Sequence, residues 1–425
     1  MREYAVKIER NGAWQRVGTI AGAAPGEAIF RYGGEYLQDP EAAAISLSLP
    51  LQEEPFSPEK TANFFDGLLP EGFTRRAVAE WMRVDERDYL SILYGLGREC
   101  LGAVRIAPEN EKEEAWYERV SPDQMRDLAA EGAVKSAELV VKAHLSLTGA
   151  SGKVGLYYDE AQDAWYLPHG TAPSTHIVKQ SHIRYREIVA NEQLALLTAE
   201  RCGIDIPESF IVNVGAGADA EVLFATQRFD RQMPETPIYT SGLARPLRLH
   251  QEDFAQALGI PAQRKYEHAD EGYLKQMFDL LLTRVRNPLE DRMRLWKRIV
   301  FYALIGNADA HIKNISLLYA PDLRSLSLAP AYDIVSTAVY DQSTREMAFA
   351  IGGDRVLDAI TRASFVRAAE EIGLAERAAM RALDEVCGRF ETALAEAAEE
   401  LDRQGFTSAE GLREKMLRGG AYRNM

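Results

Sequence analysis

Ile305-Gly306-Asn307-Ala308-Asp309-Ala310-His311-Ile312-Lys313-Asn314 is the most informative segment of this sequence for predicting fold and function. It comes at the end of an apolar segment that predicts a helix, and an apolar run typical of a strand follows it. Asp309 and Asn314 are five positions apart in this stretch. A further acid, Asp333, follows in Pro330-Ala331-Tyr332-Asp333-Ile334-Val335. The chain therefore presents an acid, an amide and a second acid in that order.

This order of side chains indicates phosphoryl transfer. A carboxylate must accept the proton of the attacking hydroxyl, and further oxygen ligands must hold Mg²⁺ against the triphosphate of ATP. Protein kinases place their catalytic Asp and a metal-binding Asn at this spacing, and a metal-binding Asp follows. We therefore predict that Asp309 is the catalytic base of an ATP-dependent kinase and that Asn314 and Asp333 bind Mg²⁺. Taken alone, the spacing of Asp309 and Asn314 is a weak signal, because a helix cap followed by a turn also produces it.

Two charged residues upstream match further requirements of a kinase. Lys179 ends the apolar strand predicted over 175–179, where it can meet the α- and β-phosphates of ATP. Glu192 lies on the helix predicted over 187–202 and is a candidate partner of that lysine. Both residue types are also common on solvated surfaces, so the local pattern leaves both interpretations open.

A polar loop, 146–153, precedes the first strand of the same region. Backbone N–H groups of such a loop can bind phosphate oxygens. The residues that we expect to bind ATP here are Thr148, Gly149, Ala150, Ser151, Gly152 and Lys153. The glycine spacing differs from that of a P-loop, and Val154 replaces the Ser or Thr that a P-loop requires. An ordinary β-turn is the alternative interpretation of this loop.

Composition argues against several other classes of protein. The chain has 425 residues, 46% of them hydrophobic, and a formal net charge of -15. These values fit a globular protein of two or three domains and argue against broad nucleic-acid binding. Three widely spaced cysteines exclude a disulfide framework and a zinc ribbon. We find no signal peptide and no apolar segment long enough to span a membrane, and we predict a cytoplasmic protein.

The apolar periodicity divides the chain into three parts and predicts an α+β fold. Residues 1–107 combine a β-hairpin around Asn11-Gly12 with several helices. Residues 108–249 become rich in strands, and residues 250–425 are mainly helical. The last two parts have the outline of a bilobal protein kinase with a β-rich N-lobe and a helical C-lobe. The first part adds an N-terminal β/α subdomain to that fold.

Three local expectations are specific enough to check against the structure. The chain is expected to be rich in strands from about residue 140. A helix is predicted over 251–258, and the polar tail after Gly405 is expected to be less ordered.

Further motifs resemble those of one family, the HipA kinases, which are the toxins of HipBA-type toxin–antitoxin systems. No single motif is specific, but their combination and order are, and they span nearly the whole chain. The matching pieces are 63–70 (NFFDGLLP), the loop 146–153, 173–179 (PSTHIVK), Asn191-Glu192, 227–231 (QRFDR), 251–253 (QED), 309–314 and 332–334 (YDI).

The resemblance implies roles that the residue pattern alone leaves open. The residues expected at the hinge that meets adenine are Gln227, Arg228 and Phe229. Those expected around the phosphates and the metal are His311, Lys313, Asn314 and Tyr332. Ser146 matches the position whose autophosphorylation inactivates the kinase, and Thr148 offers a second hydroxyl in the same loop. Two departures from the family pattern are Gln227, where an acid is common, and the small residues Ser151-Gly152.

The resemblance also implies partners. Members of the family phosphorylate aminoacyl-tRNA synthetases, and a helix-turn-helix antitoxin of the HipB kind holds them in check. That antitoxin binds operator DNA, so contact with DNA is expected only through it.

Two other functions stay open. A kinase of the same fold could act on a lipid head group or another small molecule. A non-catalytic protein could instead act as a corepressor through its antitoxin, although the intact residues Lys179, Asp309, Asn314 and Asp333 argue against that. An aminoglycoside-type phosphotransferase would share the catalytic loop, but the NFFDGLLP motif speaks against that class.

Overall fold

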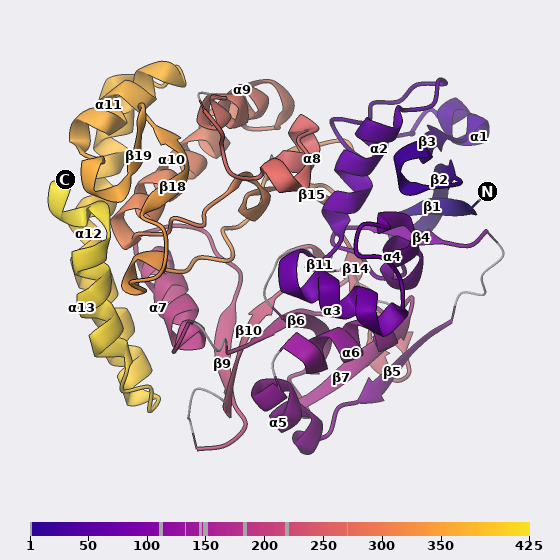
Figure 1. Cartoon of the computed structure of the whole chain (residues 1–425), viewed down its shortest axis with the longest axis horizontal. Coiled ribbons are helices and arrows are strands. Elements are labelled where there is room, and N and C mark those ends of the chain that lie inside the picture. The colour runs from indigo at the N-terminus through magenta and orange to yellow at the C-terminus, as the bar shows by residue number, and fades with distance from the viewer. Residues whose placement is uncertain are drawn as a thin grey trace.

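The computed structural model describes residues 2–109, 114–131, 133–143, 147, 152–181, 185–216, 221–269 and 271–425. In this part of the chain, the N-terminal elements lie on one side of the molecule and the C-terminal helices on the other (Figure 1). A sheet from the middle of the sequence lies between them in the same view. The predicted α+β class is confirmed.

The N-terminal part is an antiparallel sheet with helices packed around it. Its strands are β1 (Arg2–Arg10), β2 (Ala13–Gly22), β3 (Ile29–Tyr32) and β4 (Val104–Ala107), in the order β3-β2-β1-β4. Its helices are α1 (Gly34–Gln38), α2 (Pro58–Phe65), α3 (Gly72–Met82) and α4 (Tyr89–Leu96). The predicted hairpin is confirmed, and both turn residues, Asn11 and Gly12, have the positive φ that a two-residue hairpin turn favours.

A six-stranded antiparallel sheet follows, in the order β5-β7-β6-β8-β10-β9. Its strands are β5 (Ala115–Arg119), β6 (Lys153–Asp159), β7 (Ala164–Gly170), β8 (His176–Gln180), β9 (Ser209–Asn213) and β10 (Val222–Gln227). The accompanying helices are α5 (Pro122–Glu131), α6 (Ala133–Ala143) and α7 (Ile188–Arg201). The pairing of β6 with β8 sets Lys153 opposite Lys179, which brings two cations to one end of the sheet.

The expectation that the chain becomes rich in strands from about residue 140 places this change a little too early. α6 continues to Ala143, and it buries Ala137, Leu139 and Val140. The strand β5 was not predicted either, because its short and partly exposed sequence carries a weak alternation.

The C-terminal part is mainly helical. Short strands come first: β11 (Arg231–Gln232), β12 (Tyr239–Thr240), β13 (Leu243–Ala244), β14 (Leu247–Arg248) and β15 (Gln251–Asp253). The helices are α8 (Phe254–Leu258), α9 (Tyr273–Arg284), α10 (Pro288–Ile305), α11 (Arg362–Glu371), α12 (Glu376–Arg403) and α13 (Ala409–Gly419). The other strands are β16 (Ser316–Tyr319), β17 (Leu326–Leu328), β18 (Glu346–Ile351) and β19 (Asp354–Val356).

Two expectations for this part are wrong. The helix predicted over 251–258 begins only at Phe254, because the first three residues pair with β16 and Asp253 then caps α8 in a capping box with Gln256. The tail after Gly405 forms α13, which buries Leu412 and Met416. The polar residues that suggested disorder form the outer face of an amphipathic helix.

Two apolar cores hold these parts together. One lies among α7 and the C-terminal helices, with Trp296, Phe301 and Phe390 in it. The other joins residues of the N-terminal sheet, such as Ile8, to residues of the six-stranded sheet, such as Val178. The N-terminal part therefore shares its core with the six-stranded sheet.

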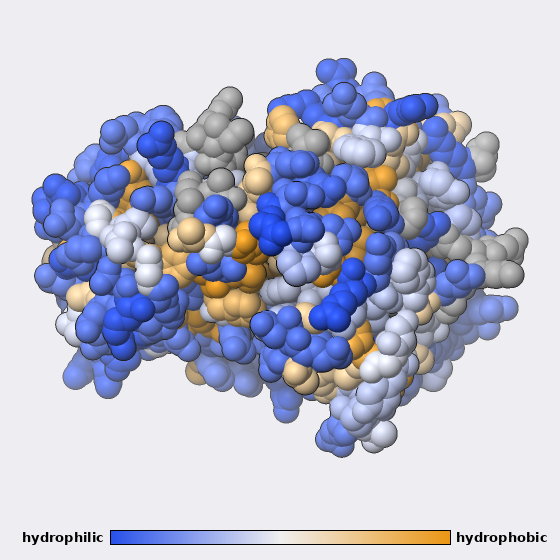
Figure 2. Space-filling view, turned by 90° about the horizontal axis from the view of Figure 1, so that it is seen from below, coloured by the Kyte–Doolittle hydropathy of each residue, from blue (hydrophilic) through white to orange (hydrophobic). Residues whose placement is uncertain are grey.

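The surface is mostly polar. Seen from below, apolar surface gathers near the middle of the molecule, between the half with the C-terminal helices and the half with the N-terminal elements (Figure 2). No helix in the described ranges is long and apolar enough to cross a membrane.

Candidate active site

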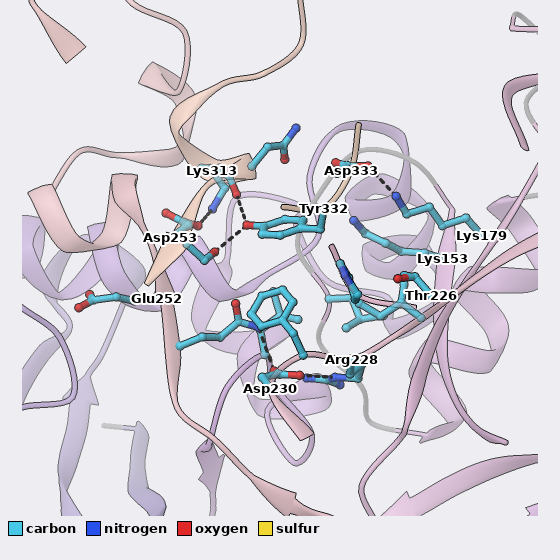
Figure 3. A pocket seen from close by; sticks show the side chains of 18 of the residues that line it. Lys153, Lys179, Thr226, Arg228, Asp230, Glu252, Asp253, Lys313, Tyr332 and Asp333 are labelled. Atoms are coloured by element: carbon cyan, nitrogen blue, oxygen red, sulfur yellow. Dashed lines mark hydrogen bonds and ion pairs between the residues drawn. The ribbon is translucent and has the colours of Figure 1, made fainter. Parts of the chain in front are cut away.

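A cavity opens where the six-stranded sheet meets the segment after α10. Side chains from β6, β8 and β10 line one wall, and residues of 311–316 and 332–333 line another. The predicted residues that it brings together are Lys153, Lys179, Gln227, Arg228, Phe229, His311, Lys313, Asn314, Tyr332 and Asp333. Figure 3 shows Lys153, Lys179 and Asp333 at one end of the cavity and Arg228 with Asp230 at another.

Lys179 binds two acids at once. Its Nζ lies 2.6 Å from Glu192 Oε1 and 2.6 Å from Asp333 Oδ1. Burial alone would lower the pKa of Lys179, but the two carboxylates overcome it and raise that pKa. Burial raises the pKa of Glu192 to about 7 despite the lysine. The three side chains thus form a charge cluster, buried at Lys179 and Glu192 and partly exposed at Asp333, in which the lysine keeps its proton.

Asp333 has an unusual backbone conformation. Its φ is +56°, in the left-handed region, which few residues other than glycine adopt. Burial would raise its pKa, but Lys179 and Lys153 outweigh burial and lower it. Asp333 is therefore an ionised oxygen donor held beside two lysines.

Lys153 has a different environment from Lys179. Burial and the charge of Lys179 lower the pKa of Lys153 to about 8, although Asp333 opposes this. Among the described residues, no acid forms an ion pair with Lys153, so this cation is available to an anionic ligand.

Asp309 lies just beyond this cavity, in a second one that shares a wall with it. The residues that line both cavities are Lys153, Lys179, His311, Asn314 and Asp333. The Asp309 side chain is exposed at the mouth of the second cavity. The surrounding protein atoms, and Asp333 nearby, nevertheless raise its pKa.

Hydrogen bonds of the backbone shape the turn that carries Asp309. Gly306 ends α10 with a φ of +72°. The Asp309 carbonyl then accepts from the backbone N–H of His311 at 2.8 Å and from Nδ2 of Asn314 at 3.0 Å. The amide nitrogen of Asn314 therefore points toward the Asp309 carbonyl, and its amide oxygen, Oδ1, takes no part in this hydrogen bond.

Tyr266 also belongs to this site, although it was not predicted. Its hydroxyl donates to Asp309 Oδ1, and its ring packs edge-on against His311 with the ring centroids 5.1 Å apart. Burial lowers the pKa of His311 well below its usual value, so that ring is neutral. Tyr266 comes from the segment before α9, and no local pattern signals a contact 43 positions away.

The NFFDGLLP motif docks on the C-terminal part. Lys313 Nζ donates to the Gly67 carbonyl at 3.0 Å and lies 2.7 Å from Asp253 Oδ2. Nδ2 of Asn63 donates to the Gly259 carbonyl at 2.8 Å. Lys313 thus lines the cavity, but its ammonium group is bound to a protein carbonyl and a carboxylate.

Comparisons with known proteins agree with this arrangement. The model of the HipA-like C-terminal domain matches residues 145–394, and that of the HipA N-terminal domain matches residues 12–107. The chain belongs to the HipA family. This confirms the family expected from the sequence motifs.

Individual relatives of the HipA family match most of the chain. "Putative kinase Y4mE" of Sinorhizobium fredii is 32% identical over 77% of this chain and 76% of its own length. The serine/threonine-protein kinase toxin HipA of Shewanella oneidensis is 26% identical over 85% of this chain and 83% of its own length. A chain in the structure of the Shewanella oneidensis HipA, HipB and operator DNA complex matches with a TM-score of 0.78 at 22% identity. That match covers 97% of this chain and 96% of the other, and it confirms the HipA fold.

The hinge expected from HipA kinases is partly occupied by protein contacts. The backbone N–H of Gln227 donates to the Glu208 carbonyl and that of Arg228 to the Thr175 carbonyl, both at 2.8 Å. The Arg228 guanidinium is buried in ion pairs with Glu99 and Asp230. The Phe229 ring lies 5.3 Å from that of Tyr332, which makes an apolar wall.

Some of the predicted residues lie outside the described ranges. They are Ser146, Thr148, Gly149, Ala150 and Ser151. Gly152 is described, and it lines the cavity that holds Asp309.

The residues present suit ATP and Mg²⁺. No group of three or more His, Cys, Asp or Glu side chains that could hold a metal occurs in the part of the chain that the structure describes. Mg²⁺ in kinases needs fewer protein ligands, because the phosphates and water supply the rest. Asp333 and Asn314 offer two hard oxygen donors, and Lys153 offers a cation without an acidic partner among the described residues.

Proposed function

We propose that this HipA-family chain is an ATP-dependent serine/threonine protein kinase that uses Mg²⁺. The bond of Lys179 to both Glu192 and Asp333, in a cavity that adjoins Asp309, supports this most directly. The names of relatives from Sinorhizobium fredii and Shewanella oneidensis, which describe kinases, agree with it. We further propose the division into 1–107, 108–249 and 250–425 as subdomain, N-lobe and C-lobe.

Each residue then has a role that its chemistry supports. Bound Mg–ATP supplies the phosphoryl group. Asp309 accepts the proton of the attacking hydroxyl, and its raised pKa makes it a stronger base than a free aspartate. Lys179, oriented by Glu192, and Lys153 attract phosphate oxygens. Asp333 and Asn314 hold the metal through oxygen atoms.

Substitution of Asp309 tests the kinase activity. Asp309→Asn should fold normally and lower the turnover of ATP-dependent phosphorylation by about 10²- to 10⁴-fold, because an amide cannot take the proton. Radiolabelled ATP with the purified protein and a cell lysate provides the measurement. Asp402→Asn, an exposed substitution in α12, should leave the labelling unchanged. Undiminished labelling by Asp309→Asn would disprove the assignment of the base.

We propose that this kinase is a toxin restrained by a HipB-like helix-turn-helix antitoxin, and that it meets operator DNA only through that antitoxin. The Shewanella oneidensis complex of HipA, HipB and operator DNA supports this by analogy of fold. An aminoacyl-tRNA synthetase is the protein substrate that we expect in the cytoplasm. Overexpression should arrest growth, and Asp309→Asn or the antitoxin should relieve the arrest. Label that appears only in lipid or small-molecule fractions would favour the alternative substrates.

We also propose that Ser146 is autophosphorylated and that this inactivates the kinase. A phosphate there adds about -1.5 to -2 charges beside the loop 148–153 and repels the phosphates of ATP. Mass spectrometry after incubation with ATP should find phosphate on Ser146, or else on Thr148, and none in the Asp309→Asn protein. Phosphate at neither position in an active enzyme would contradict this regulation.

A further inference from the structure

Tyr266 makes a direct hydrogen bond to the predicted catalytic base. Its hydroxyl donates to Asp309 Oδ1, and the rest of the ring packs on the neutral ring of His311. Burial, followed by the Asp309 charge, raises the pKa of Tyr266, so the hydroxyl remains a donor. One oxygen of Asp309 is thus occupied by a protein donor, and Oδ2 is not part of that bond.

Its two neighbours in the chain fix Tyr266 from opposite sides. Lys265 Nζ lies 2.7 Å from Glu71 Oε2, which belongs to the N-terminal part. Glu267 is buried, and its carboxylate accepts from the backbone N–H groups of Tyr273 at 2.9 Å and Ala350 at 2.7 Å. The segment 265–267 therefore joins the N-terminal part, the base and the C-terminal part through three consecutive side chains.

We propose that Tyr266 is a positioning residue for Asp309, an inference that rests on the proposed kinase function. The Tyr266 hydroxyl holds Oδ1 and so turns Oδ2 toward the acceptor hydroxyl. In the reaction, the acceptor oxygen forms a bond to the γ-phosphorus, the bond to the leaving ADP oxygen breaks, and the acceptor proton passes to Oδ2. The tyrosine proton stays on Tyr266 throughout. Holding the carboxylate in one orientation keeps the rate of phosphoryl transfer high, because small displacements of a catalytic group reduce that rate steeply.

Tyr266→Phe tests the proposal with a minimal change. The ring and its contact with His311 remain, and only the bond to Asp309 is lost. We expect kcat to fall about 10- to 100-fold. The KM and the dissociation constant for ATP should stay unchanged, because the lost hydrogen bond joins Tyr266 to Asp309 and to none of the proposed phosphate or metal ligands. A role in nucleotide binding or in folding would instead change the ATP affinity.

Tyr273→Phe is the matched control. Its hydroxyl donates to the Arg264 carbonyl at 2.8 Å, so this change removes a hydrogen bond from the same loop without touching Asp309. It should keep at least half of the wild-type kcat. An equal loss in both variants would overturn the proposal in favour of general loop rigidity. A rise of kcat in Tyr266→Phe would overturn it too, since the hydroxyl would then be blocking the acceptor position.

A measurement without turnover separates this inference from the kinase function. Tyrosine labelled with ¹³C at Cζ gives an NMR signal for Tyr266 that is absent in Tyr266→Phe. That signal should shift in Asp309→Asn and stay unchanged in Asp402→Asn. An unshifted signal in Asp309→Asn means that the contact is not made in solution and overturns the proposal. If the wild type shows no phosphorylation that depends on Asp309, the kinase function fails while the NMR result still decides whether Tyr266 orients that carboxylate.

Discussion

At the scale of single residues, buried charges dominate this site. Lys179 forms ion pairs with Glu192 and Asp333, whereas Lys153, which lies opposite it on β6, has no acidic partner among the described residues. Lys179 is therefore suited to orient its two acidic neighbours, and Lys153 is suited to attract an anionic ligand. Both lysines lower the pKa of Asp333 against the effect of burial and so keep it ionised.

The residues that we propose as metal ligands lead to one prediction. Asp333→Ala and Asn314→Ala should each abolish Mg²⁺-dependent binding of ATP, because each removes a hard oxygen ligand. Isothermal titration calorimetry with ATP, with and without Mg²⁺, measures the effect. Asn213→Ala, a change in β9 outside both cavities, serves as the control. Unchanged affinity in both site variants would refute the proposed metal ligands.

Glu252 gives a second prediction, about pH. Burial raises its pKa to about 7, against hydrogen bonds from Ser46, Tyr319 and the Leu47 backbone. Because the folded-state pKa of Glu252 is raised, its contribution to stability is fully present below the unfolded-state pKa of 4.5. This contribution is lost as the pH rises through 7. Relative to Glu252→Gln, which does not titrate, the wild type should lose about 3 kcal/mol of unfolding free energy between pH 4 and pH 8. Urea denaturation at several pH values tests this, and parallel curves for the two proteins would contradict it.

At the scale of elements, α13 supports the turn that carries Asp309. The chain after α13 runs close to the end of α10, and a Cβ added at Gly420 would lie 1.9 Å from the Leu304 carbonyl oxygen. Gly306, where α10 ends, is near Gly420 as well. The segment that the sequence suggested to be a loose tail therefore packs against the start of the turn that carries Asp309.

Two glycines near the C-terminus test this contact. Gly420→Ala should lower the unfolding free energy by about 1–3 kcal/mol through overpacking and should also reduce the phosphorylation rate. Gly411→Ala is the control, because a Cβ there meets no atom within 4 Å. Gly411 lies in the first turn of α13, where that change should stabilise the protein by up to about 1 kcal/mol. Thermal unfolding of both variants provides the measurement. Equal shifts of the melting temperature in the two variants would argue against the close packing at Gly420.

At the scale of the whole molecule, a buried ion network joins the N-terminal part to the segment that follows β10. Glu99, which follows α4, binds Arg231 at 2.7 Å and Arg248 at 2.9 Å, and it lies 3.3 Å from Arg228. Burial would raise the pKa of Glu99, but the three guanidinium groups lower it to about 2. Arg228 therefore connects the segment after β10 to the N-terminal part through Glu99.

Neutralising Glu99 should weaken this connection strongly. Glu99→Gln leaves buried guanidinium groups without their carboxylate and should cost about 3–5 kcal/mol of unfolding free energy at pH 7. Glu109→Gln, which removes an exposed ion pair with Arg16, should cost less than about 1 kcal/mol. Because the folded-state pKa of Glu99 is low, its contribution is present above pH 4.5 and is lost as the pH falls toward 2. Denaturant unfolding should show a smaller loss of unfolding free energy for Glu99→Gln at pH 3 than at pH 7. Equal losses for Glu99→Gln and Glu109→Gln would contradict the proposed role of the buried ion network.

Local patterns in the sequence were enough to predict most helices and strands. The hairpin at Asn11-Gly12, the capped start of α2 at Ser57 and the long apolar stripe of α10 depend on neighbouring residues, so they are readable along the chain. The spacing of Asp309, Asn314 and Asp333 is local in the same sense. It sufficed to predict a kinase site, and the structure brings its members to two adjoining cavities.

Only the tertiary structure showed which partners these residues meet. The contact of Tyr266 with Asp309, and that of Lys313 with Gly67, join residues far apart in the sequence, and neither has a local signature. The same holds for Arg228, whose buried partner Glu99 lies 129 positions away. Periodicity reports which face of an element is apolar, whereas the pairing of charges depends on how the elements pack.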